Sequence, residues 1–524
     1  MSKLYVFGIG GTGSRVLKAF TLLLASGLPI QTEEIIPMII DTDVDNGDLM
    51  DCKNAIREYS RIHNSLYKNV SSGDSYPDHF FRTSIRTPKG LDISGRDYGT
   101  LSNMLNHGTM THDELQESKY LLDLLFSKHQ LEEMELEKGF LGNPNVGSVV
   151  LKNVIQSSDF KEFTQSFTPG DRIFIISSIF GGTGAAGFPL LLKLFRAANG
   201  DIQNDEFIKN AIIGAITVLP YFELDNEAFK NGESAIDSNT FISKTKAALE
   251  YYNKSVRNEL DLLYYIGDSE RSQYENFDGG VKQRNLSNFI ELAAALSIFD
   301  FMEYKGNIRT REELDTPTQY AEFGIAEDTS NITLRHLTSD KLNVSMYMSR
   351  FIYFQLFITN FLDGAINNKN TAWKNDLKLT NDYHKRDFIK TLKQFSEKIY
   401  YYWLFALGDS KHRRRFTPFN LVVENEEEVT ESLDSRGEFR DRKAIKIRTN
   451  QADLMELVHD FPVKKSRGGL KKLLGAKEVD FLEIFNNEAK KKDFEKEGPN
   501  KHLTFITLMV RGMKQFYKDR ILDK

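Results

Sequence analysis

Two glycine clusters in this sequence have the residue types and spacing of phosphate-binding loops. One is Gly8-Ile9-Gly10-Gly11-Thr12-Gly13, and the other is Gly181-Gly182-Thr183-Gly184. The missing Cβ atoms let a ligand approach the backbone, and the amides at the start of a following helix favour an anion. We therefore expect a phosphate site here. For each cluster taken alone, the alternative is a turn whose glycines only permit close packing.

The segments around the two clusters predict an α/β fold with a buried parallel sheet. Arg172 to Ser178 is short, β-branched and aromatic, which is typical of a strand buried on both faces. Asn285 to Glu303 is apolar around most of its circumference and predicts a central buried helix. Other strands are expected at 3–7, 35–40, 211–219 and 260–266, and other helices at about 14–26, from about 185, and at 238–253.

Two further stretches have polar or glycine residues where a nucleotide could bind. Gly139 to Ser148 is a turn that leads into a helix, with Pro144 suited to the first helical turn. An ordinary loop before a helix is the alternative for this stretch. Asp41-Thr42-Asp43 follows the second expected strand, close to where a dinucleotide fold places its ribose carboxylate. An NAD-dependent oxidoreductase is therefore one hypothesis.

Composition limits the class of protein. The 524 residues have a net charge of −6, so no global basic field predicts nucleic acid as a partner. The single cysteine, Cys52, excludes an intramolecular disulfide framework and fits a reducing compartment. The N-terminus lacks the pattern of a secretory signal, and the apolar stretch 346–362 is interrupted by polar residues. We expect a soluble, cytoplasmic protein.

Taken in their order along the chain, the glycine clusters, the aspartate pair and the central helix resemble the markers of the tubulin/FtsZ superfamily. The length and the central helix resemble the divergent bacterial FtsZ-like proteins, which comparative work ties to membrane remodelling. The matching stretches are Gly8 to Gly13, Asp41-Thr42-Asp43, Leu141 to Gly147, Phe180 to Ala186, Pro220-Tyr221-Phe222-Glu223 and Asn285 to Glu303. Several markers in the correct order are more specific than any one of them.

The resemblance implies a site for GTP or GDP with Mg²⁺. It implies that Glu223 bonds the ribose, that Asn288 or Asn285 recognises the guanine, and that Asp43 lies near the magnesium ion. The nucleotide-binding residues implied are Gly10, Gly11, Thr12, Gly13, Asp41, Asp43, Gly142, Asn143, Gly181, Gly182, Thr183, Gly184, Glu223 and Asn288. The phosphates would be held almost wholly by backbone, because the chain has no GxxxxGK[ST] motif.

The chain also departs from the family pattern. Phe180 and Ala186 stand where the second cluster would have glycines. In the loop after the central helix, Thr333 and His336 stand where the family has carboxylates that help hydrolyse the partner's GTP. Glu327, Asp328 and His336 are therefore weak candidates for catalysis, and any hydrolysis is expected to be slow.

The expected organisation is a nucleotide-binding domain at 1–284 and a central helix at 285–305. Within the first domain, about 50–138 is expected to be a surface insertion. A mostly helical domain is expected at 306–420, unlike the β-rich second domain of FtsZ, and a charged region at 421–524. In that region Lys464, Lys465, Arg467, Lys471 and Lys472 either form a solvated face or contact a membrane or an acidic partner.

The leading functional hypothesis is a GTP-binding protein that self-assembles or acts as a scaffold, with membrane remodelling as its process. The alternatives are a non-polymerising nucleotide switch, an NAD-dependent oxidoreductase, and a structural α/β protein without a ligand. The oxidoreductase hypothesis explains residues 8–43 but assigns no role to the glycines at 181–187 and 139–147.

Overall fold

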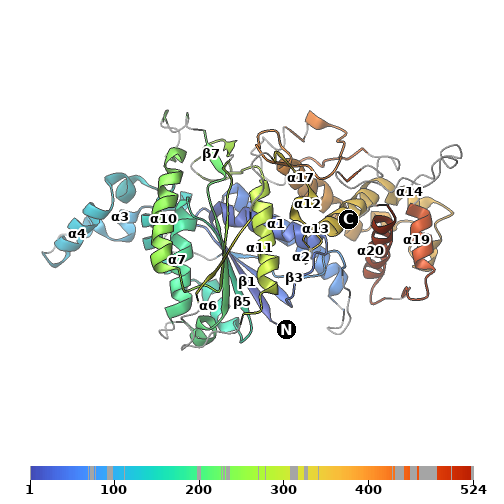
Figure 1. Ribbon diagram of the computed structural model, residues 1–524, viewed down its shortest axis with the longest axis horizontal. Coiled ribbons are helices and arrows are strands. Elements are labelled where there is room, and N and C mark those ends of the chain that lie inside the picture. Colours follow the sequence, from blue (N-terminus) through green and yellow to red (C-terminus); the bar gives the residue numbers. More distant parts are fainter. Residues whose placement is uncertain are drawn as a thin grey trace.

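A parallel β-sheet lies at the centre of the computed structural model (Figure 1). The structure describes residues 2–520 except 69, 71–75, 77, 91–97, 111–112, 198–201, 226, 228–229, 232–235, 270, 278, 307–316, 324–328, 340–341, 428, 431–441, 449–456, 459–480 and 497. The sheet has eight strands in the order β10-β8-β6-β5-β1-β2-β3, and β4 also pairs with β2. Its strands are β1 (Lys3–Ile9), β2 (Glu34–Ile40), β3 (Ser84–Ile85), β4 (Lys89–Gly90), β5 (Arg172–Ser178), β6 (Ile212–Val218), β8 (Leu262–Ile266) and β10 (Gln319–Glu322). The predicted α/β class is confirmed.

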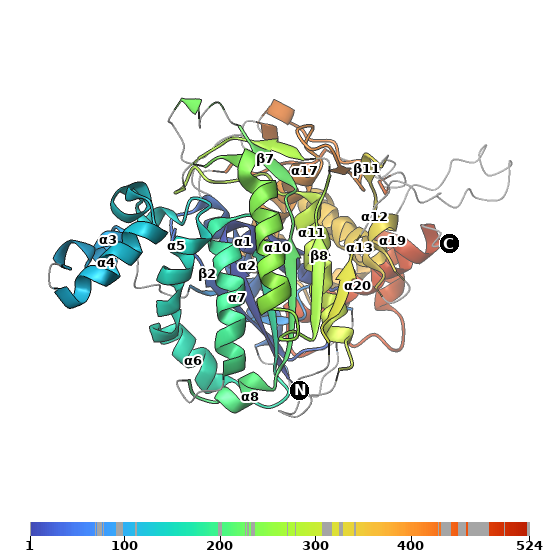
Figure 2. The same cartoon turned by 60° about the vertical axis from the view of Figure 1, so that its left-hand side comes forward.

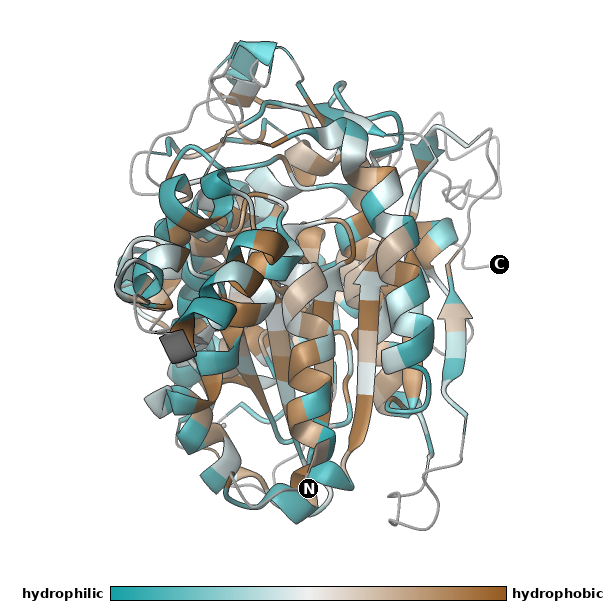
Figure 3. Ribbon diagram, turned by 90° about the vertical axis from the view of Figure 1, so that its left-hand side faces the viewer, coloured by the Kyte–Doolittle hydropathy of each residue, from teal (hydrophilic) through white to brown (hydrophobic). Residues whose placement is uncertain are grey.

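Helices cover both faces of this sheet, which is why its central strands are mostly apolar. Helices α7 (Gly182–Ala197) and α10 (Phe241–Ser255) cover one face (Figure 2). Helices α1 (Gly10–Ala25), α2 (Gly47–Tyr67) and α11 (Phe289–Glu303) cover the other. The strands between these layers are predominantly hydrophobic (Figure 3).

The connection order places a crevice beside β1. From β1 the chain passes through α1 to β2 on one side, and it later returns at β5 on the other side of β1. Strands β6 and β8 then continue away from β1. Ligands of open parallel sheets bind at such a switch point, outside the carboxyl ends of the strands. Both glycine clusters follow these ends, one after β1 and one after β5.

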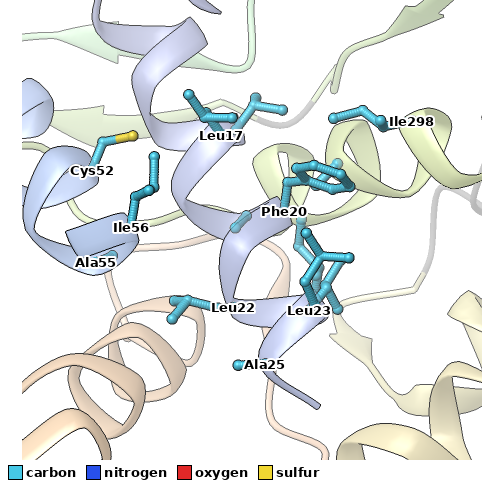
Figure 4. Close-up of a cluster of buried hydrophobic side chains, with 14 of the residues drawn as sticks. Leu17, Phe20, Leu22, Leu23, Ala25, Cys52, Ala55, Ile56 and Ile298 are labelled. Atoms are coloured by element: carbon cyan, nitrogen blue, oxygen red, sulfur yellow. The ribbon is translucent and has the colours of Figure 1, made fainter. Parts of the chain in front are cut away.

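The central helix α11 packs on α1, as the sequence pattern predicts. Phe20 and Ile298 meet between the two helices, while Cys52 and Ile56 of α2 lie on the other side of α1 (Figure 4). Nearly every residue of α1 is buried. The core on this face therefore joins the three helices that surround the amino-terminal glycine cluster.

The expected surface insertion at about 50–138 is shorter in the structure. Helix α2 is part of the main body, and β3 and β4 extend the sheet. Only the later part projects from the body, with α3 (Leu101–Met104) and α4 (Asp113–Leu125) forming an arm (Figure 1). The prediction that residues from about 50 are surface-exposed was wrong for α2. This helix buries only one face, so charged residues interrupt its apolar ones and the hydrophobic pattern looks irregular.

After residue 323 the described part of the chain is mostly helical, as predicted, and its only regular strands are β11 and β12, which pair with each other. Helix α20 (Lys501–Arg520) packs on α13 (Val344–Leu356) through buried residues such as Met509. No described helix is both long and apolar enough to cross a membrane. The remaining elements are β7 (Phe222–Leu224), β9 (Ser272–Tyr274), β11 (Asn331–Ile332), β12 (Arg415–Phe416), α5 (Pro144–Val150), α6 (Ser158–Ser166), α8 (Asp205–Lys209), α12 (Leu334–Leu337), α14 (Leu362–Asn367), α15 (Ala372–Asp376), α16 (Asp387–Phe395), α17 (Tyr401–Leu407) and α19 (Phe481–Ala489).

Candidate functional site

A pocket lies at the carboxyl ends of β1, β2 and β5. Three segments that are far apart in the sequence line it together: Gly10 to Thr12, Gly139 to Gly142, and Gly181 to Gly184. Asp41 and Asp43, just beyond β2, line it as well. The stretches that the sequence singled out therefore converge on one site.

Some of the glycines are required by packing. A Cβ on Gly13 would lie 2.7 Å from the carbonyl carbon of Gly8, and one on Gly184 would lie 2.6 Å from the carbonyl oxygen of Ser178. A Cβ on Gly182 would lie 2.9 Å from the Cβ of Phe140, in the third loop. For these three positions the packing explanation is sufficient, and Gly13 is not among the pocket-lining residues.

Close packing does not account for the other two glycines of the first loop, Gly10 and Gly11. Gly10 has a φ of +71°, a left-handed conformation that favours glycine. A Cβ on Gly11 would meet nothing closer than 3.5 Å, the distance to Nη1 of Arg15. Because a Cβ at Gly11 would make only ordinary contacts, close packing does not require this glycine, whereas a ligand against the backbone would explain it.

The two long helices that begin at the pocket have N-termini suited to an anion. Helix α1 begins at Gly10, and Ile9 before it offers no side-chain cap. Helix α7 begins at Gly182, and neither helix has an acidic residue in its first turn. By contrast, the side chains of Asn46 and Asn288 cap α2 and α11. The amides of α1, which no N-cap side chain caps, and the dipoles of both helices therefore converge on the pocket, where a phosphate would satisfy them.

Arg15 is a buried cation at the edge of the pocket, and the sequence analysis missed it. Its guanidinium donates to Asp48 and Glu291, and also to the hydroxyl of Tyr221 at 2.8 Å. Burial alone would lower the pKa of Arg15, but Tyr221 and the two carboxylates outweigh it and raise that pKa. Arg15 is thus held by two carboxylates, and it ties α1 to α2 and α11. An arginine close to the glycine cluster, in a helix that is mostly apolar, was the available signal.

Asp41 and Asp43 place two carboxylates at the same edge. Oδ2 of Asp43 accepts a hydrogen bond from the amide of Gly280 at 2.7 Å. Burial, with the nearby charge of Asp43, raises the pKa of Asp41 to about 7. The described residues contain no group of three or more possible metal ligands. Mg²⁺ often takes one or two carboxylates together with substrate phosphates, so this pair fits a magnesium ion bound with a nucleotide.

The wall away from the glycines is largely apolar. Phe222 and Leu224 of β7 line it together with Ile236, Phe241 and Phe277. The ring of Phe180 also lies here, 5.0 Å from the ring of Phe241. Phe180 therefore extends an aromatic surface where the family pattern has a glycine. Such a wall suits the faces of a planar base.

Two expected contacts are not found at the pocket. Glu223 lies between Phe222 and Leu224 on β7, and strand alternation turns it to the other face. There its carboxylate pairs with Arg271 at 2.6 Å. Asn288 is buried as the cap of α11, where Oδ1 accepts from the amide of Ile290 and Nδ2 donates to Oγ of Ser272.

Polar residues that do line the pocket near these positions are Glu275, Gln283 and Asn285. Asn285 was the second choice for recognising the base. Asn143 does not line the pocket, because its Nδ2 donates to the carbonyl oxygens of Phe140 and Leu141 and shapes the third loop. Gly142, beside it, does line the pocket.

Of the three catalytic candidates, only His336 lies in the described part of the chain, and it does not line this pocket. His336 lies on α12, where its Nδ1 accepts from the amide of Thr333 at 3.0 Å, and it lines a different cavity. Glu327 and Asp328 lie outside the described residues, as does the basic cluster Lys464, Lys465, Arg467, Lys471 and Lys472. Ala186 has a packing role, since a Cβ on Gly147 of α5 would lie 2.8 Å from its own.

Neither a protein-family model nor a curated protein matches this chain. Among solved structures, the chain is similar to CetZ2 from Haloferax volcanii, described as a GTPγS-bound protofilament, with 13% identity and a TM-score of 0.27. It is also similar to CetZ from Methanosaeta thermophila, with 14% identity and a TM-score of 0.26. Each match covers 58% of this chain, and 58% and 54% of the two CetZ chains respectively.

Proposed function

We propose that the chain binds GTP or GDP with Mg²⁺ in the pocket between β1 and β5. The observation that carries the proposal is the convergence of the α1 and α7 N-termini, both without acidic residues in their first turns, on one glycine-lined pocket. Phosphates placed there accept backbone amides and meet the positive ends of two helix dipoles.

The charges around the pocket support a nucleotide that arrives with a cation. Asp41, Asp43 and Glu275 line the pocket, whereas Arg15 and Lys138 are its only cationic lining residues in the described part of the chain. Arg15 is paired with two carboxylates, and Lys138 pairs with Glu135 at 2.6 Å. Mg²⁺ would supply the missing positive charge, with Asp41 and Asp43 holding it directly or through water.

The base is expected against the aromatic wall, with its polar edge toward Glu275, Gln283 or Asn285. Guanine presents an N–H and an amino group side by side, and a carboxylate can accept from both. Adenine lacks this pair of donors and could not make both hydrogen bonds to the carboxylate of Glu275. This chemistry favours guanine.

An NAD-dependent oxidoreductase is less well supported. That hypothesis needs the first glycine cluster and Asp41, but it assigns nothing to the second cluster or to the loop of Gly142, which line the same pocket. The site is more fully explained by one nucleotide with a chain of phosphates that contacts both clusters.

We further propose that nucleotide binding serves self-assembly, and that the assembled protein is a cytoplasmic scaffold that remodels membranes. The resemblance in the motifs supports this role, and a non-polymerising switch is the alternative. Light scattering against protein concentration, with GTP and with GDP, distinguishes the two. An assembling protein gives a critical concentration, and a switch gives no concentration-dependent rise.

Calorimetry with GTP, ATP and NAD, each with Mg²⁺ and with EDTA, tests the binding proposal. We expect GTP to bind more tightly than ATP or NAD, and EDTA to weaken the binding of GTP. Tighter binding of NAD, or binding that EDTA leaves unchanged, would contradict the assignment.

A further inference from the structure

A second cavity lies beside the central helix α11, and none of its lining residues lines the nucleotide pocket. It has a volume of about 320 Å³, and its lining residues come from α11, from β8 and β10 at the sheet edge, and from the segment around α12. Figure 2 shows α11, β8 and α12 near one another. Most of its lining side chains are apolar, among them Tyr265, Leu296, Phe323 and Leu342. A cavity of this size and lining suits a small molecule.

The face of α11 that lines this cavity differs from the rest of the helix. Ala293, Leu296, Ser297 and Asp300 recur at helical spacing and form one stripe along it. The stripe begins with small side chains, which leave the space open, and ends at a carboxylate. Elsewhere the helix is almost wholly apolar and buried.

The rim of the cavity is acidic. Asp300, Glu303 and Glu322 line it with exposed side chains, and no lysine or arginine is among its described lining residues. The hydroxyl of Tyr264 donates to Oδ2 of Asp300 at 2.7 Å, and a carboxylate can accept further hydrogen bonds. Glu303 accepts from Gln31 at 2.9 Å. An apolar interior with a negative rim is complementary to an apolar cation.

We propose that this cavity binds a small molecule that has an apolar ring body and a protonated amine. The ring system enters between Leu296 and Phe323, and the amine meets the carboxylates of Asp300 and Glu322. The site shares no lining residue with the nucleotide pocket, so its test is independent of whether the chain binds GTP.

Two probes with the same ring and opposite charge test the proposal on the full chain. N-(1-naphthyl)ethylenediamine is a cation at pH 7.5, and 1-naphthaleneacetate is an anion. Equilibrium dialysis at low ionic strength is expected to show the cation bound about three- to tenfold more tightly, since each exposed carboxylate contributes modestly. Equal affinities, or no binding of either probe at millimolar concentration, would overturn the proposal.

Variants locate the bound probe. Asp300→Asn with Glu322→Gln is expected to bring the two affinities to within about twofold of each other, because the rim loses two charges. Asp387→Asn is the matched control, since that side chain is 89% exposed on α16 and distant in sequence. The control should keep the full preference. A preference that survives the double change would place the cation elsewhere.

Filling the cavity should abolish binding of both probes. Ala293→Phe places a ring in it from α11, and Ala321→Phe does so from β10, which is partly exposed and tolerates change more readily. Circular dichroism verifies folding of each variant. Undiminished binding of the cation by either folded variant would exclude this cavity as the site.

Discussion

Replacing Gly11 by valine tests whether this glycine is needed for ligand binding or for packing. A Cβ on Gly11 would have Arg15 Nη1 at 3.5 Å and Oδ2 of Asp48 at 3.6 Å, both ordinary contacts. Valine also has a higher helix propensity than glycine, so the free energy of unfolding should change by less than about 1 kcal/mol. The branched methyl groups, however, would occupy the space that a phosphate needs against the backbone.

The expected loss of affinity follows from the amides that the phosphate would no longer reach. A hydrogen bond to a charged group contributes about 1.5–3 kcal/mol, so the loss of two such bonds costs about 3 kcal/mol or more. This corresponds to a rise in the Kd for GTP of about a hundredfold or more. Calorimetry with Mg²⁺ and GTP measures it, and thermal unfolding in the absence of nucleotide verifies the fold.

The matched control is Gly364→Val. Gly364 lies in α14, and no atom would lie within 4 Å of a Cβ placed there. The same chemical change far from the pocket should leave the Kd unaltered. A Gly11→Val protein that folds normally and binds GTP as tightly as the parent would refute the phosphate assignment. Gly182→Val is a poorer test, because its Cβ would meet Phe140 at 2.9 Å and disturb the third loop.

Three other predictions concern neighbouring residues. Asn288→Ala should lower the free energy of unfolding by about 1 kcal/mol through loss of the α11 cap. Glu275→Gln should reduce the preference for GTP over ATP in calorimetry. If Asn288→Ala reduced this preference and Glu275→Gln did not, Asn288 would be the residue that recognises the base. The pKa of Asp41 is raised to about 7 in the folded state, from about 3.9 when unfolded, so folding favours its protonated form. Its contribution to the free energy of unfolding is therefore complete below about pH 4 and is lost as the pH rises to about 7. Asp41→Asn should make the free energy of unfolding, measured by chemical denaturation, change less with pH over this range. GTP hydrolysis should be slow at every protein concentration, and a fast, concentration-dependent release of phosphate that His336→Ala abolishes would show that His336 acts on a neighbouring subunit.

The buried strands and the glycine loops were predictable because their patterns are local. Strand β5 has the predicted bounds, Arg172–Ser178, since a strand buried on both faces is apolar without interruption. The central helix was predictable for the same reason, although α11 begins at Phe289 and not at Asn285. The glycine clusters then had to meet, because they follow adjacent parallel strands.

Side-chain direction was not predictable from the resemblance. Glu223 and Asn288 match positions of the family pattern, but β7 turns Glu223 away and the helix cap occupies Asn288. The network of Arg15, Asp48, Glu291 and Tyr221 joins residues that are up to 276 positions apart, so no local pattern could reveal it. Helix α2 was missed because its apolar face alternates with charges.

The central claim is that the pocket between β1 and β5 holds a guanine nucleotide. The most direct test is to incubate the purified chain with a mixture of GTP, ATP and NAD in the presence of Mg²⁺. Free ligand is then removed by desalting, the protein is heat-denatured, and the released molecules are identified by chromatography. We predict GTP or GDP at close to one per chain, and much less from Gly11→Val. Release of NAD or ATP in preference to guanine nucleotide, or equal release from Gly11→Val, would contradict the claim.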